Sequence, residues 1–98
     1  MTRTPRILAR DNYQCAYCDG RNGRAVHADH IVPVALRRRY GGFDGDEWLV
    51  ASCAADNWRK GTRRLVPPSW SDRLGELPGT KPWMVWDGSI ESLRPTLR

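Results

Sequence analysis

Short apolar stretches alternate with turn-forming residues along the 98-residue chain. The clearest strand signal covers residues 25–34, where valine and isoleucine supply most of the apolar positions. Residues 7–9 predict one helical turn ahead of that strand. Val66 is followed by Pro67 and Pro68, and we expect them to end whatever helix precedes them because proline cannot continue a helix.

The last third of the chain has a different composition. Residues 67–98 are rich in proline, glycine and tryptophan and show little periodicity. Residues 69–74 favour a short helix and residues 83–86 a short strand, but so few apolar residues cannot build a second core. We therefore divide the chain into a domain of residues 1–66 and a C-terminal extension of residues 67–98. The extension either packs its tryptophans on the domain or offers a surface to a partner or to DNA.

The charge of the chain suggests a nucleic-acid partner. The formal net charge is +5, and arginine, whose planar fork suits phosphate, supplies nearly all the basic residues. Arg37, Arg38 and Arg39 form the densest run, which either grips phosphates or is an ordinary solvated loop. No apolar run reaches the roughly 20 residues of a membrane span, and the N-terminus lacks the apolar core of a signal peptide. We expect a soluble protein with a cytoplasmic location and no membrane partner.

The cysteines point to a metal. A domain this small needs a metal ion or a cross-link to stabilise its fold. Cys15 and Cys18 have the spacing of half a zinc site. The second half contains Cys53 and, three residues later, Asp56. Either Asp56 completes a structural zinc site, or the site is weak and Asp56 caps the helix that follows. His27 is a further candidate ligand.

Asp29 and His30 are the candidate reactive pair. Adjacent strand residues point to opposite faces, so the two can serve one site only if the strand bends or ends there, as Pro33 suggests. A divalent metal held by Asp29 beside a neutral His30 acting as base would hydrolyse a phosphodiester. The alternative is a surface aspartate and a half-buried histidine at a strand end.

Taken together, five segments resemble the HNH endonuclease family in order and spacing. They are residues 10–18, 28–33, 41–42, 49–50 and 53–61. The resemblance covers roughly residues 6–61, none of the C-terminal extension, and points to the small free-standing HNH proteins of phages. It implies an α+β chain with a ββα-metal fold, in which a hairpin carries Asp29 and His30 and a helix over residues 56–64 carries the last metal ligand.

The resemblance also implies a mechanism and a DNA surface. Asp29 and Asn57 would hold one Mg²⁺ or Mn²⁺, with Ni²⁺ or Zn²⁺ as alternatives, and His30 would take a proton from the attacking water. Asn57 could instead be a capping residue. A single such site cuts one strand, so double-strand cleavage needs a pair; we expect a monomer or weak dimer. The expected DNA contacts are Arg37, Arg38, Arg39, Arg59 and Lys60.

One departure from the family matters for activity. Trp48 stands where the family has its middle asparagine, the residue thought to orient the base histidine. Tryptophan cannot accept a hydrogen bond from imidazole, so the acceptor must be a backbone carbonyl, Asp46, Glu47 or water. Two other functions therefore stay open: a zinc-stapled DNA-binding module without catalysis, and an accessory subunit that binds phage packaging or mobile-element proteins through the aromatic extension.

Overall fold

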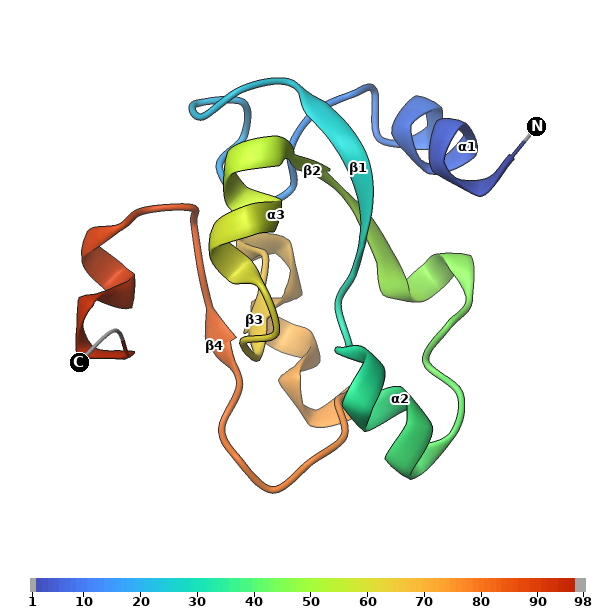
Figure 1. Ribbon diagram of the computed structural model, residues 1–98, viewed down its shortest axis with the longest axis vertical. Coiled ribbons are helices and arrows are strands. Elements are labelled where there is room, and N and C mark those ends of the chain that lie inside the picture. Colours follow the sequence, from blue (N-terminus) through green and yellow to red (C-terminus); the bar gives the residue numbers. More distant parts are fainter. Residues whose placement is uncertain (1, 97–98) are drawn as a thin grey trace.

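The computed structural model describes residues 2–96, and it confirms a small chain of mixed helices and strands (Figure 1). The helices are α1 (Arg3–Arg10), α2 (Val34–Tyr40) and α3 (Ala54–Lys60). The strands are β1 (Ala25–His30), β2 (Leu49–Cys53), β3 (Leu65–Val66) and β4 (Met84–Val85). Further 3-10 helices cover Asp46–Trp48, Pro68–Glu76 and Glu91–Thr96. Among the described residues, no helix has the length and apolar character needed to span a bilayer.

β1 and β2 form the antiparallel pair against which α1 and α3 pack. The register places Ala25 opposite Cys53 and His30 opposite Leu49, with an irregularity between Ala25 and His27. Every residue of β2 is buried because helices lie to either side of the pair, with α1 and α3 both in contact with it (Figure 1). α3 follows β2 directly, so the end of that strand and the start of the helix are fixed together.

Several boundaries differ from those predicted. The strand expected over residues 25–34 ends at His30, and the basic run after it forms α2. The helix expected over residues 56–64 starts at Ala54, because the Cys53 sulfur caps it by accepting the backbone N–H of Asp56. The helix ends at Lys60 and is followed by Gly61, whose φ of 54° lies in the left-handed region.

The C-terminal extension shares the core of the first 66 residues. Trp70 and Trp86 are buried in one apolar cluster with Tyr17 and Ile31. β3 pairs in parallel with β4, which joins the extension to the chain just after α3. Removing residues 67–98 would therefore open the core and not merely shorten the chain.

Candidate metal centre and the Asp29 and His30 site

Three thiols and one carboxylate meet in the interior next to α3. Cys15, Cys18, Cys53 and Asp56 are each at most 1% exposed, and their candidate ligand atoms all lie within 4.8 Å of one another. Cys18 Sγ and Cys53 Sγ are 3.9 Å apart. Two thiolates bound to one tetrahedral zinc at about 2.3 Å would lie about 3.8 Å apart, so the donor set fits such an ion. His27 is exposed on β1 and lies outside this cluster, contrary to its candidacy.

The chain positions these donors through short local structures. Cys15 and Cys18 lie in the turns after α1, where Cys18 Sγ accepts the backbone N–H of Asn22 at 3.3 Å. Cys53 ends β2, and Asp56 occupies the first turn of α3. Asp56 is therefore a member of the cluster, and the capping role that we left open for it belongs to Cys53.

Asn22 supports the cluster from outside. Its side-chain Nδ2 donates to Asp56 Oδ1 at 2.8 Å and to the backbone carbonyl of Gly88 at 3.1 Å. Asp56 Oδ2 faces the thiols, at 3.2 Å from Cys15 Sγ. One carboxylate oxygen is thus held by an amide while the other points to the candidate ion, an arrangement usual for metal ligands. The sequence did not identify Asn22, since an asparagine beside glycine reads as a turn residue.

The thiols and the carboxylate of the cluster differ in their ionisation. Burial raises the pKa of the Cys15 thiol and raises the pKa of the Cys53 thiol to about 12. For Asp56, burial disfavours the charged form, but hydrogen bonds from Cys18 and Asn22 outweigh it and lower the pKa of the carboxyl. A divalent ion would convert the buried thiols to thiolates, which are the ligands that zinc needs.

The C-terminal extension closes over this cluster at Gly88. Gly88 has φ +86°, and a Cβ built on it would lie 2.7 Å from Cys18 Cβ and 3.0 Å from Asp56 Oδ2. Next to it, Arg21 Nη2 donates to the carbonyl of Asp87 at 2.6 Å. Only glycine fits this approach, so the extension forms part of the wall of the metal centre.

Asp29 is bound to α3 through a buried lysine. Its Oδ2 lies 2.7 Å from Lys60 Nζ and accepts the phenol of Tyr17 at 2.5 Å. Lys60 is 1% exposed and also donates to the backbone carbonyl of His30 at 2.8 Å. Burial lowers the pKa of Lys60, and the Asp29 charge opposes that shift. The prediction that Lys60 contacts DNA is wrong, because its ammonium lies inside the molecule with its hydrogen bonds made.

The His30 ring has a different partner from Asp29. Its Nε2 lies 2.7 Å from Asp44 Oδ1, and Arg37 Nη1 lies 3.0 Å from the same oxygen. The hydrogen bond from His30 is the largest influence on the pKa of Asp44 and lowers it; burial opposes this shift, and the charges of Arg3 and Arg37 lower the pKa further. The acceptor is thus Asp44, which the sequence analysis did not name.

Asp46, a candidate acceptor for the His30 ring, and Trp48 contact other residues instead. Asp46 pairs with Arg6 in a two-pronged contact of 2.9 Å. The Trp48 ring packs against Phe43 and Trp70, at centroid distances of 4.9 and 5.6 Å. Trp48 therefore packs, half-buried, against the core, and its ring offers no acceptor to the imidazole.

The remaining predicted residues lie on two helices, α2 and α3. Asn57 is half-buried on α3, and Arg59 Nη1 lies 3.8 Å from Asp56 Oδ1 at the edge of the metal centre. Arg38 and Arg39 are exposed on α2, whereas Arg37 is engaged with Asp44. Within residues 2–96, the cysteine and Asp56 cluster is the one group of three or more Cys, His, Asp and Glu donors close enough to hold a metal.

Comparison with protein-family models, with curated proteins and with solved structures finds no match for this chain.

Proposed function

We propose that this chain is a metal-dependent endonuclease with the ββα-metal fold of HNH enzymes, and that it hydrolyses DNA phosphodiester bonds. The observation that carries the proposal is the contact of His30 Nε2 with Asp44 Oδ1 at the end of β1. A carboxylate bonded to Nε2–H fixes one imidazole tautomer and leaves the Nδ1 lone pair available to take a proton. His30 is then the general base that activates the attacking water.

The proposed metal ligands at the reacting phosphate are oxygen atoms of Asp29 and Asn57. Lys60 and Tyr17 both contact Asp29 Oδ2, which leaves Oδ1 as the ligand atom. A carboxylate and an amide carbonyl are hard ligands suited to Mg²⁺ or Mn²⁺. Such an ion stabilises the charge that develops on the phosphate, while Lys60 and Tyr17 hold the Asp29 side chain in place.

The cysteine cluster is assigned to structure and not to catalysis. Three thiolates and a carboxylate leave no open position on a tetrahedral ion, as in structural zinc sites. The proposed zinc ties the turns after α1 to the end of β2 and the start of α3, at the Ala25 end of β1. It supports Asp29 only through α3, whose Lys60 contacts that carboxylate.

The proposed DNA contact is α2. Arg38 and Arg39 are exposed there, and Arg37 joins the helix to His30 through Asp44. Phosphates held by this helix would lie beside the base, and the affinity should fall steeply with salt.

A plasmid assay tests the proposal. Purified protein with Mg²⁺, Mn²⁺, Ni²⁺ or Zn²⁺ added should convert supercoiled plasmid to open circles, and His30→Ala should abolish this while keeping the same melting temperature. Val34→Ala, an exposed position on α2, serves as the control variant. Equal nicking by the wild type and by His30→Ala would reject the assignment of the base.

A second function, a DNA-binding module without catalysis, is favoured by one observation. The Lys60 ammonium already neutralises Asp29 at 2.7 Å, and this weakens the attraction of that carboxylate for a cation. Plasmid retarded in a gel but never nicked, with any of the four metals, would identify this module.

A further inference from the structure

Among the described residues, Trp58 is the most exposed large hydrophobic side chain. It is 83% exposed on α3, and Ile90 beside it is 46% exposed. The two residues line a pocket together with Arg59, Arg63 and Leu93. An indole left in water next to arginines has no packing role in this chain, so it suggests a ligand with a flat face and negative charge.

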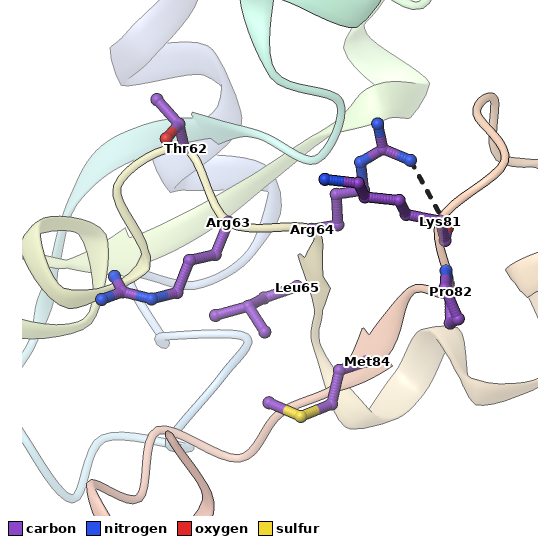
Figure 2. Close-up of a pocket in the computed structure, with 7 residues that line it drawn as sticks. All are labelled: Thr62, Arg63, Arg64, Leu65, Lys81, Pro82 and Met84. Carbon is purple, nitrogen blue, oxygen red and sulfur yellow. Dashed lines mark hydrogen bonds between the residues drawn. The ribbon is translucent and has the colours of Figure 1, made fainter. Parts of the chain in front are cut away.

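A second pocket adjoins the first through Arg63. It is lined by Thr62, Arg63, Arg64, Leu65, Lys81, Pro82 and Met84. In Figure 2 the Arg63 side chain extends to one side while Arg64 and Lys81 lie together on the other, where Arg64 Nη1 is 3.4 Å from the Lys81 carbonyl. Among the described residues, no aspartate or glutamate lines either pocket.

Hydrogen bonds to the backbone fix the Arg63 side chain between the two pockets. Its Nη1 donates to the backbone carbonyls of Arg59 and Lys60 at the end of α3, the second contact being 3.5 Å long. A guanidinium that is already fixed loses little freedom when it binds a phosphate.

We propose that these two pockets form a binding track for single-stranded nucleic acid. A base stacks on the Trp58 indole, and the phosphates that follow it contact Arg63, Arg64 and Lys81. The choice of nucleic acid rests on the proposed function, and the track adds to it a single-strand surface on α3 and β4 that is separate from the arginines of α2. Stacking platforms beside cationic grooves are how proteins hold single strands without reading their sequence.

Charge favours a nucleic-acid strand as the occupant of the track over a second copy of the chain or an apolar protein segment. A second copy of the chain would bring the same cationic residues against each other, which is unfavourable. An apolar protein segment would cover Trp58 and Ile90 but would leave Arg64 and Lys81 without a counter-charge. A nucleotide strand satisfies both the apolar and the cationic part of the track.

Fluorescence anisotropy with a labelled single strand of thymidines tests the track, in buffer without added divalent cation so that nothing is cut. Trp58→Ala should weaken binding about tenfold, and Trp58→Phe should restore most of it. A strand of the same length without bases should bind wild type and Trp58→Ala equally. Arg64→Ala and Lys81→Ala should each weaken both strands and reduce the salt dependence of log affinity by roughly 0.7.

Tyr13→Ala is the matched control, because Tyr13 is also an exposed ring beside an arginine, with Arg24 4.6 Å from its centroid. It should leave the affinity unchanged. Equal affinity of Trp58→Ala and wild type for the thymidine strand would overturn the proposal, as would an equal loss on the strand without bases. A change in oligomeric state with Trp58→Ala, without a change in strand affinity, would assign the surface to self-association instead.

The experiments distinguish failure of the proposed single-strand binding track from failure of the proposed nuclease activity. A chain that binds the strand through Trp58 but never nicks plasmid keeps this inference and loses the proposed catalysis. A chain that nicks plasmid through His30 while Trp58→Ala binds normally loses only this inference.

Discussion

The imidazole of His30 and the carboxylate of Asp44 lie 2.7 Å apart, although the two residues are separated by 14 positions. The connecting chain returns through Gly41 and Gly42, which have φ values of 74° and 81°. The left-handed conformation that glycine tolerates thus brings the acceptor back beside the strand end.

Replacing Asp44 should impair the proposed catalysis without impairing folding. Asp44→Ala removes the acceptor that selects the His30 tautomer, so we expect plasmid nicking to fall by about tenfold to a hundredfold while DNA affinity stays near that of the wild type. Asp44→Asn, which keeps an acceptor oxygen but not the charge, should lie between the two. Nitrogen chemical shifts of the His30 ring should show a mixture of tautomers in Asp44→Ala. An unchanged ring spectrum would contradict the orienting role.

The metal centre predicts a defined response to chelation and to substitution. We expect one zinc per chain, and its removal should lower the melting temperature sharply because metal affinity contributes to folding in such sites. Asp56→Cys should retain zinc against a chelator at least as well as wild type, and Asp56→Asn should lose it sooner. Glu76→Gln, an exposed carboxylate paired with Arg73, is the control. Protein that holds no metal and melts identically with and without chelator would refute the centre.

The sequence predicted the cysteine cluster because its spacing is local. Cys15 and Cys18 are brought together by one turn, and Cys53 and Asp56 by the start of one helix. The prediction therefore had to assume only one long-range contact, the one between these two pairs. The orientation of α3 could not be read in the same way. Its inner face carries Asp56 and Lys60, one turn apart, while Trp58 points to solvent.

This helix reverses the usual pattern of apolar residues inside and polar residues outside. Its inner face is selected by the thiol cluster and by the Asp29 carboxylate, which are polar partners supplied by distant parts of the chain. A sequence pattern reports apolar burial, and it cannot report which charged groups find partners in the core. Asp44 was missed for a similar reason, because its contact depends on the path of a glycine-rich loop.

Gly88→Ala tests whether the C-terminal extension seals the metal centre. The new methyl group would meet Cys18 and Asp56 in a backbone conformation that alanine disfavours, so we expect a loss of about 1–3 kcal/mol in unfolding free energy. Zinc should also be lost faster to a chelator. Gly75→Ala is the control, since a Cβ there meets nothing within 4 Å, and it should change stability by less than about 1 kcal/mol. Equal melting temperatures and zinc loss for the two variants would show that the extension does not close the site.

The buried ion pair between Lys60 and Asp29 should be needed for folding. Lys60→Met keeps the length of the side chain but leaves Asp29 without its counter-charge, so we expect a loss of about 3–5 kcal/mol. The double variant Lys60→Met with Asp29→Asn should recover part of this loss, since no unpaired charge stays behind. Denaturant titration measures both. A Lys60→Met protein as stable as wild type would mean that Lys60 does not hold the strand end.

Tyr17 gives a prediction for the dependence of stability on pH. Burial, and then the charge of Asp29, raises the pKa of its phenol well above the usual value of 10. In the unfolded chain the phenol ionises near pH 10, so above that pH the folded state binds more protons and stability falls. The stability that wild type has over Tyr17→Phe should therefore be constant below about pH 9 and shrink as the pH rises through 10. Urea titrations at a series of pH values measure this difference, with Tyr13→Phe at an exposed position as the control. A difference that stays constant up to pH 11 would show that the Tyr17 phenol ionises as readily in the folded chain as in the unfolded one.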